Sequence, residues 1–320
     1  MLWGILVISL SFMTVALIPM AGAVVFFLTP LPIFFFMEKL GRFKGFVSFT
    51  ISLLIAGVIL RSIGTGGGIG SFVILGCFGI FIYEILRKNL SIEKTIVYTV
   101  LAGTSFFLLI LLVYSIVLQQ MPWTLIGSYI TRSFQESIEL SVQIGAQSDQ
   151  IKFLKDNMRL ITRSVLYLFP ALTLVGICSV VCLNILIGRR IFLANGLAYP
   201  DFGELTRWKA PDRLVWFLIA SGGIVLIPSV FGFDIMELIV LGLNIAIVCL
   251  FVYFIQGLAI FEFLFKAKRV PRILCLLFYA ILMIQQYLMI VVIAAGLFDL
   301  WFDFRHLTPR PQEPEDNIES

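Results

Sequence analysis

The chain contains 320 residues, of which 60% are hydrophobic, 13% are charged and 31 are phenylalanines. A soluble domain has about 25% charged residues, so too few charged side chains are present here to cover a water-exposed surface. The net charge of +4 is small, and no basic run is long enough to form a nucleic-acid interface. The composition therefore predicts an all-α, polytopic transmembrane helix bundle that contacts the lipid bilayer and binds no nucleic acid.

Nine apolar segments are close to the length of about 20 residues that a helix needs to cross a bilayer. We expect spans at 3–20, 22–37, 45–62, 68–86, 95–117, 161–188, 213–230, 235–265 and 272–298. Prolines 30 and 32 interrupt the second segment, so three arrangements stay open for residues 1–37: two spans, one bent span (eight in all) or a re-entrant hairpin. No Lys or Arg precedes the first segment, which favours a retained anchor over a cleaved signal.

The apolar segments divide the chain into four regions. We expect an N-terminal membrane region of about five spans, an extramembrane insert, a C-terminal membrane region of about four spans and a disordered acidic tail, at 1–118, 119–160, 161–306 and 307–320. In the predicted topology, the loops on the same side of the membrane as the N-terminus carry about twice as many Lys and Arg residues as the loops on the opposite side. This bias predicts that the N-terminus lies inside and the C-terminus outside.

The insert contains one periodic stretch. Apolar residues recur every four positions at Ile126, Ile130, Phe134 and Ile138, which is typical of an amphipathic helix. We expect this helix to lie along the outer membrane surface. A solvated connector is the alternative.

The residue content argues against catalysis. The single histidine, His306, lies next to the tail, and the five cysteines lie within apolar segments. Cys178 and Cys182 share a helix face but have no third ligand nearby, so we expect them to pack between helices. No catalytic constellation, metal site or cofactor motif is found, and we predict that the chain is not an enzyme and has no cofactor. The glycine-rich stretch 64–70 matches no nucleotide motif and predicts a compact loop or a flexible gate.

Two acidic residues lie close to basic residues at the ends of predicted spans. Glu84 comes one turn before Arg87 and Lys88, and Glu262 one turn before Lys266. We expect each carboxylate to be interfacial, either snorkelling or paired with these bases.

Uncharged polar residues lie far from the span ends in the C-terminal region. Charge and polarity are costly in hydrocarbon, so such residues are candidates for function. The tentative ligand-binding set is Asn244, Tyr253, Gln256, Gln285 and Gln286. These side chains either line a pocket for a small uncharged or zwitterionic solute or hydrogen-bond to one another and hold the helices together.

The C-terminal third carries a recognisable pattern. Its residues are Trp208, Pro211, Asp212 and Trp216 before a span, Gln256 and Gly257 within the next, and Pro271, Gly296, Asp299, Trp301, Asp303 and Arg305 around the last. Over residues 200–306 this pattern resembles the YybS-like family of bacterial multi-pass membrane proteins, a domain of unknown function. The resemblance implies a location in the bacterial cytoplasmic (inner) membrane. We also expect Asp299 to cap the last helix or pair with Arg305, either as a structural lock or as a ligand contact.

The YybS-like family is in turn distantly similar to the substrate-binding S components of energy-coupling factor transporters. That similarity implies a solute-binding or transport component that works with a separate coupling subunit. The alternative is a non-transporting scaffold or assembly factor for envelope proteins, with the insert as its interaction face.

Overall fold

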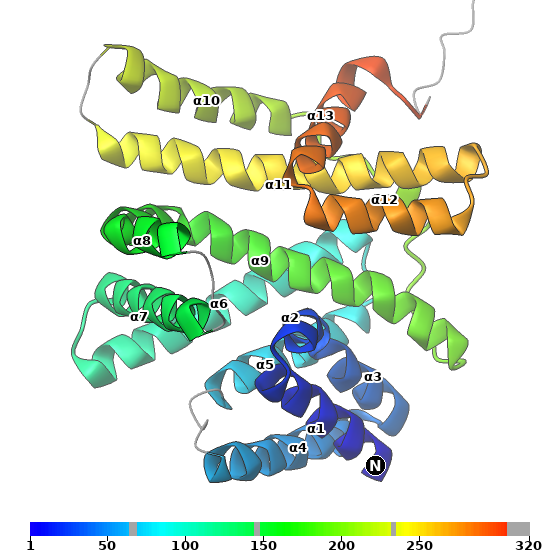
Figure 1. Ribbon diagram of the computed structural model, residues 1–320. Coiled ribbons are helices and arrows are strands. Elements are labelled where there is room, and N and C mark those ends of the chain that lie inside the picture. Colours follow the sequence, from blue (N-terminus) through cyan, green and yellow to red (C-terminus); the bar gives the residue numbers. More distant parts are fainter. Residues whose placement is uncertain (64–68, 144–147, 232–234, 306–320) are drawn as a thin grey trace, which may run out of the picture. The chain divides into compact units, whose positions relative to one another are not determined.

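The computed structural model describes residues 1–63, 69–143, 148–231 and 235–305, and every regular element within these ranges is a helix (Figure 1). The predicted all-α class is therefore confirmed. The chain forms two compact units, residues 1–202 and residues 203–320. The predicted tail, His306 and most of the glycine-rich stretch 64–70 lie outside the described residues.

The first unit contains nine α-helices among its described residues, and the predicted insert belongs to it. They are α1 (Leu2–Leu17), α2 (Pro19–Leu28), α3 (Pro30–Leu40), α4 (Arg42–Ser62), α5 (Ile69–Leu86), α6 (Ile92–Leu118), α7 (Pro122–Gln143), α8 (Ser148–Asp156) and α9 (Met158–Ala194).

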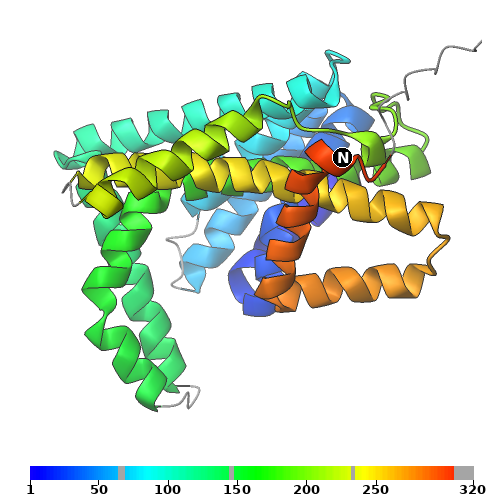
Figure 2. The ribbon, with the colours of Figure 1, turned by 90° about the horizontal axis from the view of Figure 1, so that it is seen from above.

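The second unit is built around one long helix. Its elements are the 3-10 helix η2 (Leu205–Arg207) and the α-helices α10 (Leu214–Phe231), α11 (Met236–Ala267), α12 (Arg272–Ile284) and α13 (Gln286–Phe302). Helices α10 and α11 form an antiparallel pair, α12 leaves the end of α11, and α13 crosses back to α11 (Figures 1 and 2).

Fewer helices than the nine predicted spans are long enough to cross a membrane. Five described helices are long and apolar enough to cross a membrane, namely α4, α5, α6, α9 and α11. The number rises to seven if each of two bent helix pairs is one span. Helix α1 has only 16 residues, or about 24 Å, which is less than the roughly 30 Å of bilayer hydrocarbon. Within α10 (Leu214–Phe231), the segment searched for a span is Leu214–Ile227.

Both bent pairs fall where a single predicted span is interrupted. Helices α2 and α3 meet at 43°, consistent with the prolines that open α3, and α12 and α13 meet at 111°. The second bend is at Gln285, whose extended backbone (φ −102°, ψ 98°) ends α12. The predicted span 272–298 therefore consists of two helices, as a broken span or a re-entrant loop, and it breaks at a residue that carries no sequence signal for a break.

A buried amide supports the break between α2 and α3. The last carbonyls of a helix have no partner within it. Asn184 of α9 is fully buried, and its Nδ2 donates to the carbonyl of Phe27 at 2.7 Å as well as to that of Val180 at 2.7 Å. Asn184, which lies near the end of the predicted span 161–188, thus satisfies a carbonyl that the broken helix leaves free.

The predicted amphipathic helix is α7, and its apolar face is covered by protein. Ile126, Ile130 and Ile138 are buried, and α7 packs against α9, where Leu166 lies 3.7 Å from the position of a Cβ on Gly127. Figure 2 shows α7 alongside the first part of α9.

Candidate functional site

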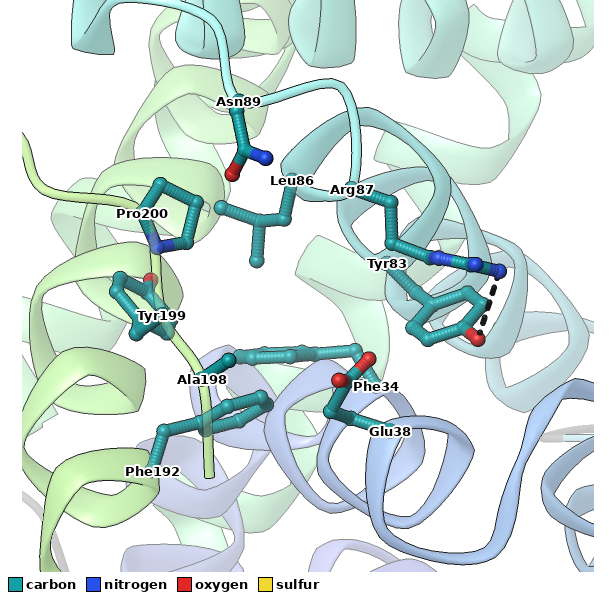
Figure 3. Close-up of a pocket in the computed structure, with 10 residues that line it drawn as sticks. All are labelled: Phe34, Glu38, Tyr83, Leu86, Arg87, Asn89, Phe192, Ala198, Tyr199 and Pro200. Carbon is teal, nitrogen blue, oxygen red and sulfur yellow. Dashed lines mark hydrogen bonds between the residues drawn. The ribbon is translucent and has the colours of Figure 1, made fainter. Parts of the chain in front are cut away.

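A cavity of about 240 Å³ opens in the first unit where three helices end (Figure 3). It is lined by residues from α3, from the last turns of α5 and α9 and from the connections that follow α5 and α9. These residues are Phe34, Glu38, Tyr83, Leu86, Arg87, Asn89, Phe192, Ala198, Tyr199 and Pro200. The volume is slightly below the roughly 300–1,000 Å³ of typical ligand pockets, so the cavity suits a small molecule.

Aromatic rings form one side of the cavity. Phe34 of α3 stacks on Phe192 of α9 with ring centroids 5.3 Å apart, and Tyr199 meets Phe192 edge to face at 5.2 Å. Gly188 allows this arrangement, because a Cβ there would come within 2.7 Å of the Phe34 ring. The rings are therefore held in place by packing before any ligand arrives.

Tyr199 is anchored through its hydroxyl. The hydroxyl donates to the carbonyl of Ile185 at 2.7 Å. Burial raises the pKa of the Tyr199 phenol, and the nearby Arg189 only partly opposes this rise. The phenol thus stays protonated and keeps donating to Ile185 at physiological pH.

The cavity also contains a carboxylate without a protein partner. Glu38 is half-buried on the last turn of α3, and none of the hydrogen bonds or ion pairs between described residues involves its side chain. In Figure 3 its carboxylate lies beside the Phe34 ring and faces the cavity. A half-buried carboxylate in this state is available to a ligand.

The basic residue of the cavity is engaged by a neighbouring ring. The guanidinium carbon of Arg87 lies 5.6 Å from the centroid of Tyr83, and its Nη1 donates to the Tyr83 hydroxyl at 3.4 Å. Of the alternatives left open for Glu84, pairing with Arg87 or Lys88 is not found, and Arg42 of α4 binds the carboxylate at 2.7 Å instead. The contact between α4 and α5 supplies a partner that lies far away in the sequence.

Asn89 completes the cavity from the turn after α5. Its backbone is left-handed (φ 48°), a conformation that Asn adopts more readily than most residues. Figure 3 shows its amide directed from above toward the space between Pro200 and Leu86. The site thus offers one carboxylate, one amide, the Arg87 guanidinium and aromatic walls, which suit the binding of a small molecule.

The second unit contains a polar cluster of a different kind. The side chains of Asp299 and Arg305 are almost completely buried and pair at 2.6 Å. Gln256 of α11 is also buried; its Nε2 donates to Asp299 Oδ2 at 3.1 Å and its Oε1 accepts from the backbone N–H of Ala210 at 3.1 Å. The predicted pairing of Asp299 with Arg305 is therefore confirmed.

Backbone groups satisfy most of the remaining atoms of this cluster. Arg305 Nη1 donates to the carbonyls of Thr206 at 2.9 Å and Trp208 at 2.8 Å, and Asp299 Oδ1 accepts from the N–H of Phe304 at 3.0 Å. The cluster therefore ties α11, the end of α13 and the segment around η2 together. Two buried atoms next to it, Arg305 Nε and the Tyr253 hydroxyl oxygen, lack a hydrogen-bond partner among the described residues.

Comparison with known proteins identifies the family. A family of predicted membrane proteins, DUF2232, matches residues 6–300. The chain belongs to the DUF2232 family. It matches no curated protein and no solved structure. DUF2232 membership and the apolar helices together show a multi-pass membrane protein.

In this DUF2232 protein, the predicted amide set does not form one group. Tyr253 and Gln256 are fully buried on α11, whereas Gln285 and Gln286 are exposed at the break between α12 and α13. Asn244 lies nearer the N-terminus of α11, and its Nδ2 donates to the carbonyl of Val240 at 2.8 Å. Whether any of them binds a ligand stays a prediction.

The remaining residues of the C-terminal pattern lie at a helix contact or at helix ends, and one of them is exposed. Gly257 and Gly296 let α11 and α13 touch, because a Cβ on Gly257 would strike the carbonyl oxygen of Val292 and one on Gly296 that of Tyr253. Pro271 precedes α12, Trp301 is exposed, and Asp303 ends α13 in a left-handed conformation (φ 40°).

The predicted pairing of Glu262 with Lys266 is also present. The Lys266 Nζ lies 3.7 Å from Glu262 Oε1, and the hydroxyl of Tyr279 donates to Glu262 Oε2 at 3.0 Å. Cys178 and Cys182 lie 3.9 Å apart at their sulfur atoms, and no group of three potential metal ligands occurs in the described part of the chain.

The sequence reasoning missed the cavity residues. Glu38, Arg87 and Tyr199 lie near the ends of helices. Charged and aromatic residues are common there at a membrane interface, so their presence does not indicate a binding site. One signal was present: Glu38 follows the aromatic run of residues 34–36 directly.

Proposed function

We propose that this protein is the solute-binding component of a membrane transporter and that its binding site is the cavity at the ends of α3, α5 and α9. The observation that carries the proposal is the Glu38 carboxylate, which has no partner in the described part of the chain and lies in a cavity with preformed aromatic walls. Binding pockets combine an apolar surface with a few convergent polar groups, and this cavity combines the stacked rings with Glu38 and Asn89.

The proposed setting is the bacterial cytoplasmic membrane, with the N-terminus inside and the C-terminus outside. The excess of Lys and Arg in the loops on the same side of the membrane as the N-terminus supports this orientation. The resemblance of residues 200–306 to the YybS-like family, and of that family to S components, supports a role beside a separate coupling subunit.

A second ligand contact is proposed for Tyr253 and Gln256 of the predicted amide set. Its support is a pair of buried atoms, the Tyr253 hydroxyl oxygen and Arg305 Nε, for which the residues that the structure describes supply no hydrogen-bond partner. Its weakness relative to the cavity is that both polar ends of the Gln256 amide already bind protein groups.

Blocking the cavity tests the proposed function. Ala198→Trp adds an indole at the cavity rim, and Ala194→Trp adds one at an exposed position of α9 that does not line the cavity. We expect native mass spectrometry of the gently solubilised wild type to detect a bound small molecule, and a panel of small polar solutes to raise its unfolding temperature. Ala194→Trp should keep both effects and Ala198→Trp should lose them.

Solute binding that is equal in both variants would contradict the cavity as the site. A stable protein partner without any bound solute would favour the alternative of a scaffold for envelope proteins.

A further inference from the structure

We infer that the solute of this cavity is a small organic cation whose ammonium group lies between Glu38 and the aromatic rings. The inference rests on the proposed function and adds the chemical class of the ligand. Three independent features of the cavity favour a positive charge: the free carboxylate, the helix ends and the rings.

The carboxylate is the first feature. Glu38 has no hydrogen-bond or ion-pair partner among the described residues, although two basic side chains lie close in sequence or space. Lys39 places its Nζ 5.5 Å from the centroid of Phe35, and Arg87 is directed onto Tyr83 (Figure 3). A bound ammonium group would supply the counter-charge that neither base supplies.

The helix ends are the second feature. The carbonyl ends of α3, α5 and α9 all meet at the cavity, since Glu38, Leu86 and Phe192 belong to their last turns. A helix C-terminus carries the equivalent of about half a negative charge and favours cations within the last turn. Three such ends around one small cavity add to the potential of the carboxylate.

The aromatic rings are the third feature. Phe34, Tyr83, Phe192 and Tyr199 all line the space. The face of an aromatic ring attracts an ammonium group within about 6 Å, and rings arranged as a cage select quaternary ammonium compounds. Asn89, across the cavity from Phe34 (Figure 3), offers a hydrogen bond to a second polar group of the same ligand.

Isothermal titration of the full-length protein in lipid nanodiscs tests the charge. The probes are choline, tetramethylammonium and n-butylammonium, and the neutral control is 3,3-dimethylbutan-1-ol, which has the shape of choline without its charge. We expect at least one ammonium probe to bind saturably, and choline to bind at least tenfold more tightly than its neutral analogue.

Removal of the carboxylate tests the assigned residue. Glu38→Gln should weaken ammonium binding at least tenfold, whereas Glu93→Gln, at an exposed position in the first turn of α6, should leave it unchanged. Thermal unfolding of both variants confirms that they are folded.

The failure of this inference can be told apart from failure of the proposed function. Absence of saturable binding by all three ammonium probes, or equal binding of choline and its neutral analogue, would overturn the cationic ligand. A solute bound by the wild type and lost in Ala198→Trp would still support the proposed function in either case.

Discussion

The polar cluster of the second unit and the cavity of the first unit differ in how their polar side chains are satisfied. In the second unit, Asp299, Arg305 and Gln256 bind one another and nearby backbone groups, so nearly all of their polar atoms are satisfied within the protein. In the first unit, the half-buried Glu38 lies in an open cavity without a partner among the described residues. A buried charge is tolerated when it is paired, and an unpaired one needs solvent or a ligand.

This difference separates a structural role from a binding role. The closed cluster joins three segments of the second unit and is expected to contribute stability. The open cavity is expected to contribute little stability and to carry function. Four substitutions test this division, ordered from the largest expected effect on the free energy of unfolding to the smallest.

Loss of one member of the closed ion pair has the largest expected effect. Asp299→Leu leaves the buried Arg305 guanidinium without its counter-charge, and breaking such a pair costs about 3–5 kcal/mol. Chemical unfolding in detergent micelles, followed by circular dichroism, measures the loss. The double variant Asp299→Leu, Arg305→Met should be less destabilised than Asp299→Leu alone; an equal or larger loss would show that the pair is not the main contribution.

A methyl group at the contact of α11 and α13 has the next largest effect. Gly296→Ala places a Cβ against the carbonyl of Tyr253, and overpacking of this kind costs about 1–3 kcal/mol. Gly222→Ala on α10 is the matched control, because a Cβ there meets nothing within 4 Å. The same unfolding measurement should show no loss for Gly222→Ala. Similar losses in both variants would contradict the close contact of the two helices.

Removing the amide of Gln256 has a somewhat smaller effect. Gln256→Leu leaves the buried N–H of Ala210 without an acceptor, and an unsatisfied buried donor costs about 1–2 kcal/mol. Gln285→Leu, at the exposed break before α13, should change the free energy by less than about 0.5 kcal/mol. Differential scanning calorimetry of the two variants compares them directly, and equal losses would place both amides in the same environment.

The open cavity should give the smallest change in stability. Glu38→Gln removes a charge that binds no described protein group, so the free energy of unfolding should stay within about 0.5 kcal/mol of the wild type. A loss above about 1 kcal/mol in the same calorimetric experiment would show that Glu38 has a structural partner and would weaken the comparison of the two units.

Local sequence relations predicted the pairs that form within a few residues. Glu262 with Lys266 and Asp299 with Arg305 are both present, because a helical turn or a short chain segment brings them together. The partner of Glu84 could not be predicted in this way, because Arg42 reaches it only through the packing of α4 on α5.

The helix breaks and the cavity show where sequence reasoning ends. Prolines 30 and 32 predicted the break before α3. The bend of 111° at Gln285 could not be predicted, because this position is neither Pro nor Gly. The cavity is assembled from helix ends that lie more than a hundred residues apart, such as Phe34 and Phe192. No local pattern could place these rings face to face.

Photoaffinity mapping tests most directly whether the open cavity, rather than the closed cluster, is the binding site. A diazirine derivative of choline would be cross-linked to the full-length protein in nanodiscs, with and without excess choline, and the labelled peptides sequenced. The account predicts competable labelling within residues 34–38, 83–89 and 192–200. Competable labelling confined to residues 253–256 or 285–287, or no competable labelling at all, would contradict it.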